Sequence, residues 1–139
     1  MTNILFFSPT GNIGGAEVNL INMCQALPQK GYIPIVVLPK EGELPKKLTE
    51  LGIKQIYFST WWLLGGEITK TLIGAIIIAL KTWRFKIKII HSNSKYSMYI
   101  PAYLAVITRK AFVLHWADFD IRKGDQKLLN IIKSKTTIL

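Results

Sequence analysis

One segment near the N-terminus constrains the fold of this chain more than any other. An apolar run at residues 4–7 leads into Ser8-Pro9-Thr10-Gly11-Asn12-Ile13-Gly14-Gly15-Ala16-Glu17, and apolar residues then recur at helical spacing as far as residue 27. This order is typical of a strand, a glycine-rich turn and a helix. A helix that begins at Gly14 or Gly15 directs its free N–H groups and the positive end of its dipole at the space above the loop. The sequence therefore predicts a place suited to an anion, most often a phosphate.

The spacing of these glycines disfavours two common nucleotide-binding motifs. No Gly-Lys-Ser/Thr follows them, so the segment is not a Walker P-loop, and G-x-x-G-G differs from the dinucleotide fingerprint G-x-G-x-x-G. A nicotinamide-dependent oxidoreductase is further disfavoured because Lys40 stands where the second expected strand should be followed by an acid. A plain turn, in which the glycines only permit close packing of strand and helix, remains an equal alternative.

The rest of the chain alternates between strand-like and helix-like segments. Strands are expected at 3–8, 33–38, 54–58, 88–93, 111–115 and 135–139, and helices at 15–29, 44–51, 68–83, 94–107 and 124–134. Such alternation predicts βαβ units with right-handed crossovers. The expected fold class is α/β: a Rossmann-like three-layer domain with a parallel sheet of about six strands and helices on both faces. At this length we expect residues 1–139 to form a single domain.

Two prolines give specific expectations about helix ends. Pro28 is expected to end or kink the last turn of the first helix, and Gly31 to cap it in the left-handed conformation. Pro101 is expected to kink the helix that contains it.

The helix expected at 68–83 is unusual because residues 72–80 are apolar nearly all round. Such a helix is either deeply buried or faces an apolar partner. Just before it, Trp61 and Trp62 either pack against neighbouring loops or contact a membrane interface or an acceptor.

The charge of the chain narrows the choice of partners. Eighteen Lys and Arg stand against eight Asp and Glu, for a net charge of +10, which favours nucleic acid, an anionic membrane surface or phosphorylated ligands. No helix-turn-helix or RNP pattern is present, and basic residues do not interleave with aromatics across a sheet face, so we expect no nucleic-acid partner.

The single cysteine, Cys24, excludes an internal disulfide. It falls on the apolar face of the first helix, so we expect a buried, inert thiol and no metal site. No signal peptide is recognisable, and the longest apolar run is about half of the ~20 residues that a spanning helix needs. We therefore expect a cytoplasmic protein, with peripheral attachment to the membrane as an option.

Polar residues gather directly after three of the expected strands, at positions 10–15, 91–94 and 115–120. The carboxyl ends of parallel strands share one edge of the sheet, and ligands of such sheets bind there. The sequence therefore predicts one ligand site formed by these three groups of residues.

Each polar residue also has a purely structural interpretation. His115 and His91 are candidates for hydrogen-bonded residues at strand ends, and Asp118 and Asp120 for loop or capping residues. Glu17, in the first turn of a helix, stabilises the helix dipole whatever else it does.

Four short pieces of sequence, taken in their order and spacing, resemble the N-terminal half of a retaining GT-B glycosyltransferase of the large family-four group. The pieces are Gly14-Gly15-Ala16-Glu17 with Leu20 and Leu27 behind it, Lys30-Gly31-Tyr32, Ile90-His91-Ser92-Asn93 and Val113-Leu114-His115. The family transfers a sugar, here expected to be a hexose, from a nucleotide-sugar to an acceptor, with retention of configuration and usually without a metal. The resemblance therefore implies no cofactor, with a nucleotide-sugar as the donor substrate of the complete enzyme.

The resemblance also implies roles for individual residues. Gly14 and Gly15 lie near the donor diphosphate and the acceptor, and His115 lies at the reacting sugar as the catalytic residue. His91 and Asn93 line the acceptor side, and Glu17 and Asp118 complete the expected set of substrate-binding residues.

One departure from the family affects the expected activity. In the family a C-terminal domain binds the nucleotide-sugar, chiefly through two glutamates seven residues apart, and we expect no such domain within residues 1–139. We therefore expect the chain to be inactive alone, with a C-terminal domain or partner subunit and a sugar or lipid-linked acceptor as partners. The alternative is a non-catalytic Rossmann-like module that binds a phosphorylated ligand or anchors a partner subunit to a membrane.

Overall fold

The computed structural model describes residues 1–139 with the exception of 64–66, 116–125, 127–129, 131–135 and 139. Six strands form one parallel sheet in the order β3-β2-β1-β4-β5-β6. The strands are β1 (Thr2–Phe7), β2 (Tyr32–Leu38), β3 (Lys54–Tyr57), β4 (Ile87–Ser92), β5 (Ala111–Leu114) and β6 (Thr136–Ile138). The predicted α/β class, the parallel sheet and its six strands are confirmed.

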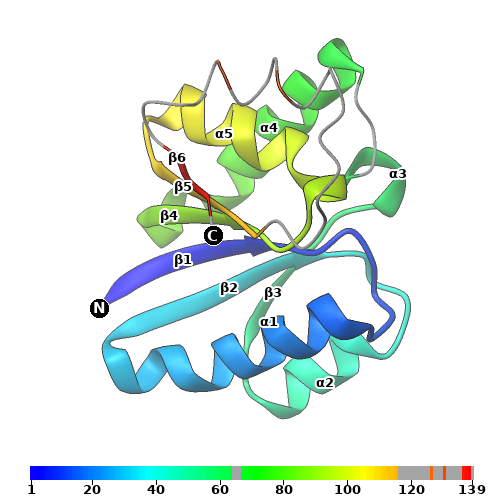
Figure 1. Ribbon diagram of the computed structural model, residues 1–139, viewed down its shortest axis with the longest axis vertical. Helices are drawn as coiled ribbons and strands as arrows, with labels where there is room; N and C mark the ends of the chain where they lie inside the picture. Colours follow the sequence, from blue (N-terminus) through cyan, green and yellow to red (C-terminus); the bar gives the residue numbers. More distant parts are fainter. Residues whose placement is uncertain (64–66, 116–125, 127–129, 131–135, 139) are drawn as a thin grey trace.

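Helices cover both faces of the sheet (Figure 1). On one face lie α1 (Gly15–Ala26) and α2 (Leu44–Glu50), and on the other lie α4 (Ile68–Thr82) and α5 (Tyr99–Thr108). The short helix α3 (Thr60–Leu63) connects β3 to the second pair. The three-layer arrangement predicted from the alternation of segments is therefore confirmed.

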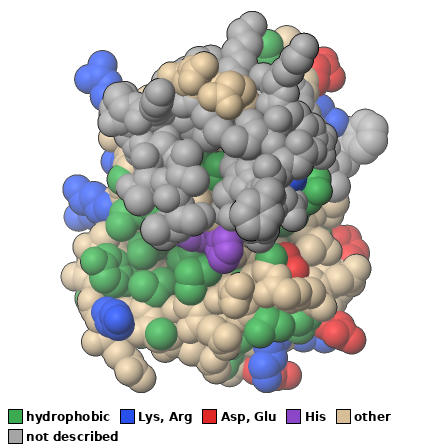
Figure 2. Space-filling view, in the orientation of Figure 1, with side chains coloured by type: hydrophobic (Ala, Val, Ile, Leu, Met, Phe, Trp, Pro, Cys, Tyr) green, Lys and Arg blue, Asp and Glu red, His purple; other side chains and the backbone are tan. Residues whose placement is uncertain are grey.

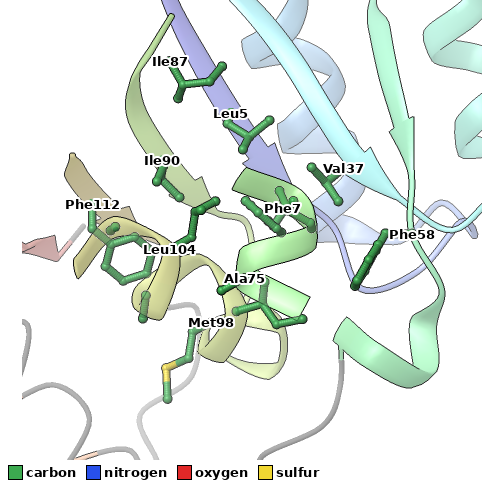
Figure 3. Packing of buried hydrophobic residues seen from close by; sticks show 14 of the residues in the cluster. Leu5, Phe7, Val37, Phe58, Ala75, Ile87, Ile90, Met98, Leu104 and Phe112 are labelled. Atoms are coloured by element: carbon green, nitrogen blue, oxygen red, sulfur yellow. The ribbon is translucent and has the colours of Figure 1, made fainter. Parts of the chain in front are cut away.

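Successive side chains of the central strand β1 point to opposite faces of the sheet, and the core therefore has two parts. Leu5 and Phe7 point toward α4 and α5 (Figure 3), where Ala75 and Leu104 are among the buried residues that meet them. Phe6, one residue out of phase, packs with the other core cluster, which includes residues of α1 and α2. Both faces of β1 are therefore buried, as expected for a parallel strand that reads as one apolar run.

The first helix ends as predicted. Pro28 lies in the 3-10 helix η1 (Leu27–Lys30), which takes over where α1 ends at Ala26. Gly31 has φ 81°, a left-handed conformation, and its N–H donates to the carbonyl of Pro28 at 3.1 Å. On the inner side of α1, Cys24 is buried, and burial raises the pKa of its thiol to about 12.

The predicted kink at Pro101 is wrong. A separate 3-10 helix, η3 (Lys95–Ser97), precedes α5, which begins only at Tyr99. Pro101 is therefore the third residue of α5, inside the first turn, where a backbone N–H has no intrahelical acceptor to lose. The strand predicted at 135–139 is β6, whereas the helix predicted at 124–134 lies almost wholly outside the described residues.

The apolar helix α4 is buried along one side only. Gly74, Ala75 and Ile78 are buried, whereas Ile76 and Leu80 are 50% and 68% exposed. It is followed by the 3-10 helix η2 (Trp83–Phe85). Within the described ranges, no helix combines the length and the hydropathy that a membrane crossing requires.

The two neighbouring tryptophans belong to α3. The ring of Trp62 packs against Phe58, with ring centroids 6.0 Å apart, and the ammonium group of Lys70 lies 5.6 Å from the Trp62 ring centroid. Trp62 thus packs against neighbouring segments, the first of its two predicted alternatives. The side chain of Trp61 lies outside what the structure describes.

Candidate functional site

The three predicted groups of polar residues begin at one edge of the sheet. β4 lies between β1 and β5, and in the register of these strands Phe7 pairs with Ser92, which pairs with Leu114. Past these pairs, the N–H of Asn93 donates to the carbonyl of Phe7 at 3.0 Å, and the N–H of His115 donates to the carbonyl of Ser92 at 2.9 Å. The end of β1 and the first residues after β4 and β5, Asn93 and His115, are therefore side by side, whereas residues 116–120 of the third group lie outside the described residues.

The loop between β1 and α1 is fixed against the loop that precedes α2. The N–H of Leu44 donates to the carbonyl of Gly11 at 2.7 Å. A Cβ atom at Gly11 would lie 1.7 Å from the carbonyl oxygen of Glu41, and the facing Gly42 has φ 109°. Only glycine allows so close an approach of two backbones, so Gly11 has a structural reason to be glycine.

The start of α1 is capped by Glu17, an acidic residue of its own first turn. The Glu17 carboxylate is buried and accepts hydrogen bonds from the Gly14 N–H at 3.2 Å and from the Ser8 hydroxyl at 3.3 Å. The carboxylate satisfies one of the free N–H groups at the helix start and offsets the positive end of the dipole. The structural interpretation of Glu17 is thus supported by two contacts, and it leaves Gly15 exposed, with no heavy atom within 4 Å of the place of a Cβ.

Asn93 connects the end of β4 to the first turn of α1. Its side chain is 1% exposed, and its amide nitrogen donates to the carbonyl of Ala16 at 2.9 Å. Among the described residues, nothing hydrogen-bonds the amide oxygen. The amide nitrogen of Asn93 therefore holds the first turn of α1, and its amide oxygen is a buried acceptor without a hydrogen bond among the described residues.

His91 is a buried and neutral imidazole. Its ring packs against the Phe6 ring, with centroids 4.7 Å apart and an angle of 44° between the planes. Burial, with a smaller contribution from the charge of nearby His115, lowers the pKa of His91 to about 4. In the part of the chain that the structure covers, its Nδ1 has no hydrogen-bond partner.

His115 follows β5 and is half-buried. Leu114 belongs to the core on the α4 and α5 side, so alternation directs His115 to the α1 side of the sheet, the side on which His91 contacts Phe6. Histidine surface is visible beside apolar side chains in Figure 2, although His91 is only 7% exposed. The structure thus brings His91 and His115 together on one face of the sheet.

The predicted site is only partly described. Gly14, Gly15, Glu17, His91, Asn93 and His115 lie at the shared edge, whereas Asp118 and Asp120 lie outside the described residues. The sequence analysis did not identify Ser8, whose hydroxyl donates a hydrogen bond to Glu17. Its position as a polar residue directly after a buried strand could have indicated this role. No group of three His, Cys, Asp or Glu side chains able to hold a metal occurs within the described ranges.

The chemistry available at this edge is hydrogen bonding and anion binding. The exposed helix start at Gly15 suits a phosphate oxygen. The two imidazoles and the buried amide of Asn93 offer donors and acceptors suited to hydroxyl groups. Further along the same edge, beyond β2 and β3, a hollow of about 220 Å³ is lined by Lys40, Glu41, Tyr57, Phe58 and Ser59.

No protein-family model and no curated protein matches this chain. Among solved structures, it is similar to Anabaena Alr3699/HepE in complex with UDP and glucose, with 19% identity and a TM-score of 0.73 over 99% of this chain and 38% of that one. A glycosyltransferase from Rickettsia africae matches with 18% identity and a TM-score of 0.73 over 99% of this chain and 42% of that one. MurG of Acinetobacter baumannii matches with 11% identity and a TM-score of 0.71 over 94% of this chain and 39% of that one.

The chain thus spans about two fifths of the length of these structures. At such low identities the likeness shows the fold alone. Residues 1–139 have the Rossmann-like fold of one domain of a GT-B glycosyltransferase.

Proposed function

We propose that this chain is the N-terminal, acceptor-side domain of a glycosyltransferase that moves a sugar from a nucleotide-sugar to an acceptor. The observation that carries the proposal is the meeting of the α1 start, Asn93 and the two histidines at one edge of the sheet. Ligands of parallel α/β sheets bind at this edge. The fold shared with glycosyltransferase structures supports the same assignment.

In this proposal His115 is the catalytic residue and contacts the reacting sugar. It is half-buried, and its backbone is held by the carbonyl of Ser92. An imidazole there can donate to or accept from a sugar hydroxyl or a carbonyl oxygen. Gly15, at the exposed helix start, receives the donor diphosphate, and Gly14, whose own N–H is bonded to Glu17, lets the phosphate approach because it has no side chain.

The remaining residues hold or complete the site. Neutral His91 faces the acceptor, and Asn93 presents its free amide oxygen there while its nitrogen holds α1. Glu17 fixes the start of α1 through Gly14 and Ser8, so we assign it a positioning role toward the substrate. Asp118 is retained as a proposed substrate-binding residue.

The proposal requires a second domain or a partner subunit for the donor. Structures with this fold extend well beyond the part that this chain matches. We propose that residues 1–139 alone do not transfer sugar, that a nucleotide-sugar is the donor and that neither a metal nor another cofactor takes part. We also propose a retaining, family-four type of hexosyl transfer in the cytoplasm, to a sugar or lipid-linked acceptor.

One observation favours a second candidate function. The outward side of α4 is apolar, which suits a non-catalytic module that anchors a partner subunit or carries a phosphorylated ligand. Such a module would use the same fold without needing His115.

The substitution His115→Ala separates the two candidates, once the donor-binding domain or subunit is supplied. We expect sugar transfer to fall by about 10²-fold or more, as for the loss of a general acid–base or electrostatic group. Thermal unfolding should stay within a few degrees of the parent, because His115 is a half-buried residue after the end of a strand.

The matched control is Gln25→Ala, on the exposed outer side of α1. It should leave transfer unchanged. If His115→Ala is as active as Gln25→Ala, the catalytic assignment of His115 is wrong and the non-catalytic module is the better account.

A further inference from the structure

The outward side of α4 carries a continuous row of apolar side chains. Ile73, Ile76 and Leu80 are 51%, 50% and 68% exposed, and Trp83 in η2 is 71% exposed. Their spacings of three, four and three residues place them on one side of the helix, opposite its buried residues. We call these four residues the α4 stripe. A surface helix of a globular protein normally presents polar residues there, so the α4 stripe requires a partner.

The neighbouring helix adds further apolar surface. α5 packs against α4, and a Cβ at Gly74 would lie 2.8 Å from Cδ1 of Ile100. α5 leaves Val106 and Ile107 40% and 50% exposed. Apolar exposure is therefore a property of the whole helix layer on this face, and not of one side chain.

Positive charge is concentrated in the same half of the chain. Between residues 59 and 115 there are eight Lys and Arg and a single acid, Glu67, whereas residues 1–58 contain five basic and four acidic residues. At the end of the α4 stripe the Arg84 guanidinium lies 5.4 Å from the centroid of the Trp83 ring. Lys86 and Lys88 follow, and both are exposed.

The excess of positive charge helps to identify the partner that covers the α4 stripe. Two copies of so basic a half would repel each other, whereas an anionic surface would be attracted. Tryptophan beside arginine, at the end of an apolar row, is the combination found at membrane interfaces. A lipid surface with anionic headgroups satisfies both the apolar and the charged part of the face.

The α4 stripe is also separate from the candidate site. α4 follows β3 and ends before β4 begins, so Trp83 lies at the edge of the sheet opposite to His91 and His115. A domain or subunit that completes the site at the carboxyl edge therefore leaves this end of the stripe free.

We propose that the α4 stripe is a membrane-docking surface that lays this domain on anionic lipid. α4 lies parallel to the membrane plane, with Ile73, Ile76 and Leu80 at the boundary of headgroups and acyl chains. Lys86, Lys88 and Arg84 contact the anionic headgroups, and Trp83 anchors the end of the row. The proposal does not depend on sugar transfer, because lipid binding is measured without donor or acceptor.

The test is sedimentation of the full chain with vesicles. We expect binding to vesicles of phosphatidylcholine with about one third phosphatidylglycerol, at least tenfold weaker binding to pure phosphatidylcholine, and weakening at high salt. The double variant Ile76→Gln/Leu80→Gln should bind the anionic vesicles at least tenfold more weakly than the parent. The double variant Arg84→Gln/Lys86→Gln should lose most of the preference for anionic lipid.

The matched control is Ile33→Gln, an exposed apolar residue of β2 outside the helix layer. It should bind vesicles like the parent, and all variants should keep the parent's circular dichroism. The proposal is overturned if the parent does not bind anionic vesicles, or if Ile76→Gln/Leu80→Gln binds as well as Ile33→Gln. It is also overturned, in favour of a second copy as the partner, if the parent is a dimer in analytical ultracentrifugation and this double variant is a monomer.

Discussion

At Gly11 two loops approach so closely that no side chain fits between them. Replacing Gly11 with Ala would place a Cβ 1.7 Å from the carbonyl oxygen of Glu41, which is backbone and cannot rotate away. We expect Gly11→Ala to lower the free energy of unfolding by about 3 kcal/mol, at the upper end of overpacking effects. Equilibrium unfolding in urea measures this loss.

The control for this substitution is four residues away. A Cβ at Gly15 meets nothing within 4 Å, and alanine suits a helix better than glycine by up to about 1 kcal/mol. Gly15→Ala should therefore leave stability unchanged or raise it slightly. Equal losses in both variants would show that the close approach at Gly11 does not exist.

His91 makes the stability of the fold depend on pH. Burial lowers its pKa from 6.5 to about 4, so the folded chain favours the neutral ring. Above pH 6.5 the ring is neutral in both states, and its contribution is complete. As the pH falls from 6.5 to 4, the unfolded chain binds a proton that the folded chain does not bind, and about 3 kcal/mol of stability is lost.

The substitution His91→Gln isolates this contribution because glutamine does not titrate. The difference in free energy of unfolding between parent and variant, measured in urea at pH 7 and at pH 4, should change by about 3 kcal/mol in favour of the variant at low pH. The carboxylates are common to both proteins and cancel. A difference that is the same at both pH values would mean that His91 is not buried.

At the scale of elements, the start of α1 depends on one carboxylate. Glu17→Ala removes the acceptor of the Gly14 N–H and of the Ser8 hydroxyl, both inside the fold. We expect a loss of about 1–2 kcal/mol in thermal or urea unfolding. Glu50→Ala on α2 is the control, since the Glu50 carboxylate only pairs with exposed Lys47 at 3.1 Å and should cost less than about 0.5 kcal/mol.

The ordering of these two losses is the decisive result. If Glu17→Ala costs no more than Glu50→Ala, the Glu17 carboxylate does not hold the helix start. The positioning role proposed for Glu17 would then have no basis.

The elements that could be predicted are those set by local patterns. β2 and β4 are found within a residue of their expected bounds, because apolar, β-branched runs ended by polar or turn-forming residues specify a buried strand. The division of the expected helix at 94–107 could not be predicted this way. It depends on Ser94, whose hydroxyl accepts from the Tyr96 N–H and favours a 3-10 turn before α5.

The candidate site also has features that the sequence predicts and features that depend on tertiary contacts. That Asn93 and His115 lie beside the end of β1 follows from the parallel sheet alone, so the sequence was sufficient for this part of the site. The bond from Asn93 to the carbonyl of Ala16 joins residues 77 apart, and the depressed pKa of His91 arises from burial against Phe6. No local pattern specifies contacts between residues so far apart in the sequence, so the hydrogen bond of Asn93 to α1 could not be predicted, whereas the structural interpretation of Glu17 followed from its place in the first turn of a helix.

At the scale of the whole molecule, the two faces of the sheet differ in what they leave exposed. The α1 and α2 face keeps most of its large apolar residues inside, whereas the α4 and α5 face exposes Ile73, Ile76, Leu80, Val106 and Ile107. The excess of basic residues lies on the second half of the chain. The two faces of the sheet therefore differ in apolar exposure, and the half of the chain that contains α4 and α5 is also the more basic half.

The central position of β1 has a consequence for synthesis on the ribosome. One edge of β1 pairs with β2, beginning with Thr2 opposite Tyr32. The other edge of β1 pairs with β4, where Asn3 is opposite Ile87, and so stays unpaired until β4 has been synthesised. At roughly 5–20 residues per second, synthesis from the end of β3 to the start of β4 takes about 1.5–6 seconds, and during this time β1 is an unpaired edge of a three-stranded sheet. Slow codons between residues 59 and 86 would prolong that interval and favour edge-to-edge association of neighbouring nascent chains, while a chaperone that covers the edge of β1 would protect the yield of folded protein.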